Sequence, residues 1–141
     1  VRLEGRELGE DGYLLDFGVV KAHMRALCKR LDERFLCPYR SPHMEVLLDG
    51  KEVGGEGGVI FPGEGSTLQL HCKCDGARLQ MPGSDAVLLP IRHSSAEELS
   101  RFLANSLLSA LSTPLTAAGI HHLTVGVIET ERQEALYRVE V

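Results

Sequence analysis

The sequence lacks two features that would class the chain at once, a long basic run and a long apolar run. No run of basic residues exceeds two, and the formal net charge is −5. Nucleic acid and anionic membranes attract proteins through basic patches, so we expect neither as the main partner. No apolar stretch approaches the ~20 residues that span a bilayer. The composition therefore predicts a soluble domain.

The sequence also lacks a signal peptide and a phosphate-binding loop. It opens at Val1 in a strand-like segment, so we expect an upstream segment to be absent. Residues 54 to 65 are rich in glycine but contain neither G-x-G-x-x-G nor a P-loop lysine. We interpret them as a mobile loop.

The four cysteines give a weak signal. Cys72 and Cys74 flank one residue in a strand-like segment, where they would share a face. Such a pair needs further ligands to hold a metal, and a disulfide between such close neighbours would be strained. We therefore expect free thiols in a reducing compartment, which favours a cytoplasmic location.

Helical periodicity predicts two helices. The first runs from about residue 17 to about residue 35, with Asp16 as its N-cap. Its apolar stripe consists of Val20, Met24, Leu27 and Leu31. The second helix begins at a capping box formed by Ser95 and Glu98, and Thr113-Pro114 is expected to stop it.

We treat residues 1–141 as a single domain in which residues 45–90 are an insertion between the helices. Short strands are predicted at residues 44–48, 68–72, 77–81 and 87–90. The pairs Asp49-Gly50 and Asp75-Gly76 are typical hairpin turns. A chain of this length can bury a substantial core.

Two carboxylates stand at positions that indicate a ligand site. Glu129 closes the strand-like run of residues 123 to 129, and an ionised carboxylate pairs well with two adjacent N–H groups of a guanidine-like ring edge. Asp32 ends the first helix, where the helix dipole makes a negative charge unfavourable. The alternative for each is a solvated charge, at a hairpin or at a fraying helix end.

Four short motifs follow one another along the chain, and their order matches that of a known family. They are Gly12-Tyr-Leu-Leu-Asp-Phe-Gly-Val-Val-Lys21, Leu31-Asp-Glu-Arg-Phe-Leu36, Ser94-Ser-Ala-Glu97 and Val125-Gly-Val-Ile-Glu-Thr130. They resemble motifs of the 6-pyruvoyl-tetrahydropterin synthase and 6-carboxytetrahydropterin synthase family. That family reads Gly-Met-Val-x-Asp-Phe-x-x-Leu-Lys, Leu-Asp-His-x-x-Leu, Pro-Thr-x-Glu-Asn and Val-x-Val-x-Glu-Thr. The match covers most of the chain outside residues 45 to 90.

The resemblance implies a fold and an activity. The expected fold is an α+β tunnelling fold, an antiparallel sheet with two helices packed on one face, here with a β-rich insertion between the helices. Family members join such sheets into barrels as trimers or hexamers, so a homo-oligomer is expected. The implied reaction is that of a carbon–oxygen lyase. It converts 7,8-dihydroneopterin triphosphate, by zinc-assisted proton transfer and triphosphate elimination, to 6-pyruvoyl-tetrahydropterin or the related carboxy product.

The motifs also carry over site residues. Asp32 matches the aspartate that supports proton transfer, and Glu33 stands where the family has its proton-transfer histidine. Either Glu33 substitutes, or a histidine such as His43 or His93 moves in. The pterin-binding positions implied by the match are Glu129, Thr130, Ser94, Ser95 and Glu97.

No zinc ligands are found in the sequence. The resemblance implies zinc held by three histidines that precede the first helix, two of them in a His-x-His turn, and no such pair occurs here. His121 and His122 are adjacent in a strand, so they are expected to point to opposite faces and not to share a metal.

Two other functions stay open at this point. Glu33 and the missing histidines favour a catalytically silent family member that acts as a pterin-binding or oligomeric assembly module. If the motif order were a coincidence, the chain would be an unrelated α+β interaction domain.

Overall fold

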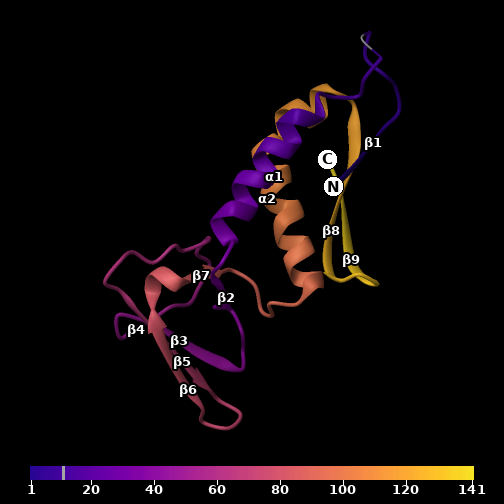
Figure 1. Cartoon of the computed structure of the whole chain (residues 1–141). Helices are drawn as coiled ribbons and strands as arrows, with labels where there is room; N and C mark the ends of the chain where they lie inside the picture. The colour runs from indigo at the N-terminus through magenta and orange to yellow at the C-terminus, as the bar shows by residue number, and fades with distance from the viewer. Residues whose placement is uncertain (11) are drawn as a thin grey trace. The chain divides into compact units, whose positions relative to one another are not determined.

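The computed structural model describes residues 1–10 and 12–141, which form two compact units (Figure 1). The first unit contains Val1–Arg30 and Ser95–Val141. The second contains Leu31–Ser94. Each unit has buried residues of its own, so each is described by itself.

The first unit is a three-stranded antiparallel sheet with two helices. The strands are β1 (Arg2–Gly5), β8 (Ile120–Thr130) and β9 (Gln133–Glu140), in the order β1-β8-β9. The helices are α1 (Phe17–Leu31) and α2 (Ala96–Ala117). Helix α2 packs against β8 and β9, and Figure 1 shows both helices on one side of the sheet. The predicted α+β class, an antiparallel sheet with two helices, is confirmed.

Strand β8 lies in the middle of this sheet and carries much of its core. Leu123 and Val125 are 0% and 1% exposed, as expected for alternate residues of a central strand. The buried side chains that α2 contributes to the unit are Phe102, Leu103, Ala104, Leu107, Leu111 and Leu115. Farther along β8, Ile128 is 70% exposed. The strand is therefore fixed at its centre and accessible at its C-terminal end.

Helix α1 starts where the sequence predicts and ends earlier. The N–H of Gly18 donates to Asp16 Oδ1 at 2.8 Å, which confirms the N-cap. The predicted end near residue 35 is wrong, because the helix stops at Leu31. Glu33 then takes a left-handed backbone conformation with φ of 55°, which an α-helix cannot continue through.

Helix α2 ends later than the sequence predicts. The N–H of Glu98 donates to Ser95 Oγ at 3.4 Å, so the Ser95 cap is confirmed. The expected stop at Thr113-Pro114 is wrong, since the helix includes Pro114 and runs to Ala117. Leu115 is fully buried in this last turn, and its packing outweighs the one backbone hydrogen bond that a proline removes. No helix in the described part of the chain is long and apolar enough to cross a membrane.

The regular secondary structure of the second unit consists of strands and one short 3-10 helix. β2 (Phe35–Pro38) pairs in parallel with β7 (Ala86–Leu89), which follows the short 3-10 helix η1 (Gly83–Asp85). The other strands form an antiparallel sheet in the order β4-β3-β5-β6. Their bounds are Met44–Leu48 for β3, Lys51–Glu52 for β4, Thr67–Cys72 for β5 and Arg78–Pro82 for β6.

The hairpin turns predicted for this unit are confirmed. Asp49 and Gly50 link β3 to β4 with φ values of 51° and 75°, the positive angles that the favoured two-residue turn requires. Asp75 and Gly76 lie in the longer connection between β5 and β6. The core of the unit is a cluster of Cys37, Tyr39, Val46, Leu68, Leu70, Ala86 and Leu88.

Candidate functional site

Strand β8 is interrupted by a β-bulge near each of its ends. At the C-terminal end Ile128 pairs with Glu134 and Thr130 pairs with Gln133, so Glu129 has no partner residue on β9. At the N-terminal end Glu4 pairs with His122 and Gly5 pairs with Ile120, so His121 has no partner on β1. Bulges re-aim side chains and are enriched beside active sites. Each bulge therefore marks a candidate site.

The first bulge opens onto a cleft of about 370 Å³. The start of α2 supplies part of the wall, and the β8–β9 hairpin supplies the rest. The lining residues are Ala96, Glu97, Glu129, Arg132, Gln133, Glu134 and Ala135. This volume lies in the range of small-molecule sites. The cleft can thus receive a ring-sized organic ligand.

The charges of this cleft are predominantly negative. Three of the lining side chains are carboxylates, and Arg132 is the one cation among them. Ionised carboxylates offer only acceptor sites, so they select ligands with several N–H donors. The carboxylates repel anionic groups, so Arg132 is the lining residue that can meet one. The carboxylate part of the cleft therefore favours the nitrogen-rich edge of a ring.

The structure brings together two of the five predicted binding residues. Glu97 and Glu129 line the same cleft although 32 positions separate them in the sequence. Thr130 is exposed at the end of β8, next to Glu129. Ser95 caps α2 through its side-chain oxygen, and Ser94 is exposed in the preceding segment. Neither serine lines the cleft.

The sequence reasoning missed the residues that β9 and the hairpin turn contribute. Arg132, Gln133 and Glu134 face the cleft, and all three lie within five residues of Glu129. The signal was present, because a hairpin that turns at Glu131 and Arg132 brings β9 alongside the end of β8. Only the register, shifted by the bulge, fixes which of them line the cleft.

Asp32 and Glu33 lie in the turn that follows α1, in the second unit. Both side chains are exposed. The left-handed conformation of Glu33 costs a non-glycine residue roughly 1–2 kcal/mol. Residues held in such conformations are concentrated at functional sites. The strain is consistent with a functional turn, and the catalytic role of both residues stays a prediction.

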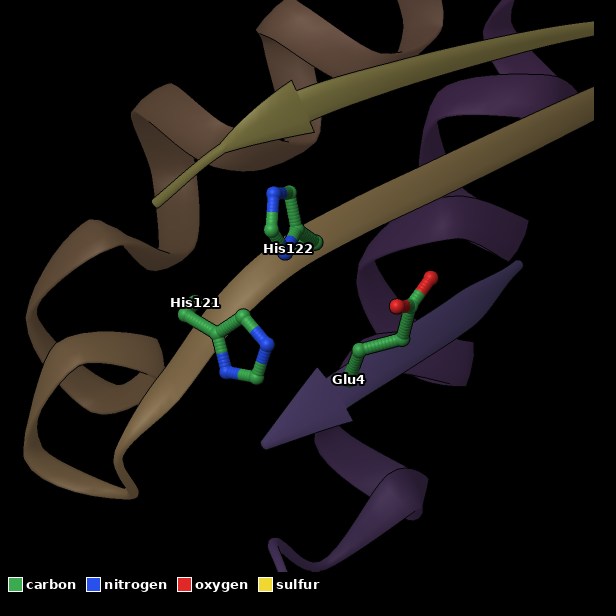
Figure 2. A group of neighbouring side chains, drawn as sticks. All are labelled: Glu4, His121 and His122. Atoms are coloured by element: carbon green, nitrogen blue, oxygen red, sulfur yellow. The ribbon is translucent and has the colours of Figure 1, made fainter. Parts of the chain in front are cut away.

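The second bulge assembles a cluster that the sequence argument had excluded. Glu4, His121 and His122 each offer a ligand atom, and these atoms lie within 4.8 Å of one another. Figure 2 shows the three side chains close together, with Glu4 on β1 and both histidines on β8. The expectation that His121 and His122 point apart is wrong, because it assumed a regular strand and His121 is the extra residue of a bulge.

Both histidines of this cluster carry an orphaned ring nitrogen. Nδ1 of His121 and Nδ1 of His122 are buried and have no hydrogen-bond partner among the described residues. The two rings meet edge to face with centroids 4.7 Å apart. A buried polar group without a partner costs about 1–3 kcal/mol. It is unusual for two neighbouring residues both to carry this cost.

The cysteine pair is a weaker metal candidate. Cys72 ends β5, while Cys74 lies in the following turn, so the expectation that both share one strand face is wrong. The neighbouring Cys72 thiolate raises the pKa of Cys74, and burial raises the pKa of Cys37 to about 11. Both shifts disfavour the thiolate form that binds metals. All four cysteines are free thiols, as predicted.

Comparison with known proteins agrees with the motif order. The family model described as 6-pyruvoyl tetrahydropterin synthase matches residues 1–140. A protein of Methanocaldococcus jannaschii, provisionally assigned as a 6-carboxy-5,6,7,8-tetrahydropterin synthase, is 26% identical over 138 residues. That match covers 98% of this chain and 74% of the relative.

Comparison with solved structures also points to this family. The 6-pyruvoyltetrahydropterin synthase of Plasmodium vivax matches with a TM-score of 0.80 and 26% identity, over 99% of this chain and 76% of that chain. A variant of that enzyme with a catalytic glutamate changed to alanine matches equally well. The Plasmodium falciparum enzyme, at 24% identity and a TM-score of 0.79, shares the fold. With a family model that spans nearly all of its residues, the chain belongs to the 6-pyruvoyl tetrahydropterin synthase family.

Proposed function

We propose that this protein binds a reduced pterin in the cleft at Glu129 and acts on 7,8-dihydroneopterin triphosphate. The reaction would be proton transfer on the side chain of the pterin with elimination of triphosphate, which retains all three side-chain carbons and gives 6-pyruvoyl-tetrahydropterin. Family membership supports the substrate class. The observation that carries the proposal is the cleft, where Glu97 and Glu129 face a space of about 370 Å³.

In this proposal Glu129 accepts two N–H bonds from the ring. The carboxylate matches the guanidine-like edge of a pterin, whose N–H groups need acceptors once water is removed. Thr130, Ser94, Ser95 and Glu97 would complete the surroundings of the ring, with Thr130 adding a neutral hydrogen bond. Arg132 is the lining residue that can meet the negative charge of the triphosphate.

Asp32 and Glu33 are the proposed proton-transfer residues. A carboxylate can accept and return a proton when its surroundings raise its pKa, although imidazole does so more readily near neutral pH. In the Plasmodium vivax relative a glutamate is described as a catalytic residue. That description belongs to the relative, and it supports here only that a carboxylate can act in this fold.

The residues of this chain do not fit the zinc site that the family implies. Residues 1–16, which precede α1, contain no histidine. The first histidine is His23, exposed on α1 with its Nδ1 3.0 Å from the carbonyl oxygen of Val19. The cluster of Glu4, His121 and His122 is a different ligand set at the far end of β8 from Glu129. The proposed proton transfers are therefore assigned to side chains of this chain.

Two measurements test the proposal. A reduced pterin is titrated against the protein, and release of inorganic triphosphate from dihydroneopterin triphosphate is followed. Glu131→Gln is the matched control for Glu129→Gln, because Glu131 lies in the same hairpin and does not line the cleft. Binding lost in Glu129→Gln but kept in Glu131→Gln supports the site. Equal affinity in both variants and in the unaltered protein would remove it.

The second candidate function is a catalytically silent pterin-binding or assembly module. One observation favours it, Glu33 in place of the family histidine. The two candidates differ in one result. A silent module binds the pterin and releases no triphosphate, whereas the enzyme does both.

We also propose that the protein is a homo-oligomer, as a trimer or hexamer. β1 and β9 are the outer strands of the sheet in the first unit, and their free edges present backbone groups that need partners. Ile128 and Leu136 are 70% and 63% exposed, which adds apolar surface beside β9. Sedimentation at micromolar concentration should report three or six chains, and a monomer alone would contradict this.

A further inference from the structure

The bulge at His121 creates a group of side chains that the proposed function does not use. In the described part of the chain, Glu4, His121 and His122 are the one set of three or more potential ligands with metal-like spacing. All three side chains are partly buried, and they come from two strands that pair directly. The cluster is therefore held by the sheet rather than by a loop.

We propose that Glu4, His121 and His122 form a binding site for a divalent transition metal, with Zn²⁺ as the best match. Two imidazole nitrogens and one carboxylate oxygen are a ligand set that zinc takes in open sites, with a fourth position left for water or another ligand. Magnesium and calcium prefer oxygen ligands alone, so the two histidines disfavour them.

The geometry is compatible with this ion. Donors on a tetrahedral zinc lie about 3.4 Å apart, given metal–ligand bonds of roughly 2.0–2.2 Å. The three ligand atoms of the cluster already lie within 4.8 Å of one another. Rotation of the side chains covers the remaining difference. Nδ1 of each histidine has no hydrogen-bond partner among the described residues, so each ring has a nitrogen that no protein group occupies.

Arg138 supplies the charge next to the cluster. One of its guanidinium nitrogens donates to Glu4 Oε2 at 2.8 Å. A carboxylate has two oxygens and about four acceptor positions, so Glu4 can hold Arg138 with one oxygen and a metal with the other. Carboxylate ligands are commonly oriented by such an outer partner. Arg138 is therefore a positioning residue in this site.

The site is far from the cleft at Glu129. His122 and Glu129 are seven positions apart on β8, about 23 Å at the rise of an extended strand. A metal at this distance does not touch a ligand at Glu129 in the same chain. It would instead link β1 to β8 and so stabilise the first unit. The proposal thus stands whether or not the pterin site is correct.

Zinc titration of the 141-residue chain tests the site directly. The chain is stripped of metal with a chelator, and Zn²⁺ is titrated in competition with a chromophoric chelator. We expect one Zn²⁺ per chain, with affinity at least ~100-fold weaker in Glu4→Gln and in His122→Gln. His23→Gln is the matched control and should bind as the unaltered chain does. The same affinity in all four proteins, or no bound zinc, would overturn the proposal.

Two further readouts keep the test independent of variants that fold poorly. Co²⁺ bound to the unaltered chain should give the d–d bands of a tetrahedral site without thiolate charge transfer. A strong thiolate band would assign the metal to Cys72 and Cys74 and overturn the site. Zn²⁺ should also raise the melting temperature of the unaltered chain and not that of a folded Glu4→Gln variant. An equal rise in both would contradict the link between β1 and β8.

Discussion

The two ends of β8 carry the same backbone defect and differ in what it exposes. At the C-terminal end the bulged residue is Glu129, exposed beside a cleft of about 370 Å³. At the N-terminal end the bulged residue is His121, partly buried in a cluster whose ligand atoms lie within 4.8 Å. An open cleft suits an organic ring, whereas a cluster this tight suits a single ion.

The comparison shows that a bulge sets the direction of a side chain. The structure around that side chain then sets which kind of ligand can bind there. The hairpin at one end leaves space because the strands stop there, so solvent reaches the carboxylates. At the other end β1 pairs alongside β8, and Nδ1 of each partly buried histidine is removed from water. Removal of water strengthens metal coordination. It also disfavours an isolated charge at this end of the strand.

The largest expected effect tests whether both ends belong to one cooperative unit. Leu123 is fully buried between them, so Leu123→Ala should lower the free energy of unfolding by about 2–5 kcal/mol. Urea denaturation measures this loss, with Leu123→Met as a control expected to cost less than about 1.5 kcal/mol. A loss below about 1 kcal/mol for the alanine variant would show that the packing of Leu123 does not hold this unit together.

The next effect belongs to the cleft alone. Glu129→Gln keeps the shape of the side chain but sets an amide donor against a ligand donor. We expect a loss of about 2–4 kcal/mol in pterin binding, roughly 30- to 1,000-fold in affinity. Calorimetric titration of a reduced pterin measures it, after a check that the oligomer survives. Zinc affinity should be unchanged, and a parallel loss of zinc would mean that the two ends are not independent.

A smaller effect on pterin affinity is expected at Thr130, the neighbour of Glu129. Thr130→Val removes one neutral hydrogen bond and should reduce pterin affinity by about 1 kcal/mol, roughly fivefold. The same titration serves, with Thr113→Val, a change in the exposed part of α2, as the control. If Thr130→Val cost as much as Glu129→Gln, the ligand would be held by the backbone at this turn rather than by charge.

The smallest effect lies at the metal end. Arg138 and Glu4 form an ion pair at 2.8 Å whose side chains are 53% and 36% exposed. Solvent screens such pairs, so Arg138→Gln should change the free energy of unfolding of the metal-free chain by less than about 1 kcal/mol. The change should fade as salt rises from low to high concentration. A large effect that persists in high salt would indicate a role in packing.

Local signals in the sequence predicted several parts of this molecule correctly. The Asp16 and Ser95 caps and the Asp49-Gly50 turn depend on contacts within a few residues, and all are present. The ordered motifs identified the family that the comparison confirms. They also pointed to Glu97 and Glu129, which share a cleft. Their shared position is compatible with the motif match, and their role in binding stays a prediction.

Only the tertiary structure decided the rest. Helix α2 passes through Pro114 because Leu115 packs in the core, and no local preference contains that packing energy. The pairing of His121 and His122 depends on where β1 joins β8, across more than a hundred residues. The rule that strand neighbours point apart follows from local geometry, and a bulge set by this distant pairing overrides it. The sequence by itself therefore determined the helix starts, the hairpin turns, the family and two of the three carboxylates of the cleft, while the register between distant strands determined the histidine cluster.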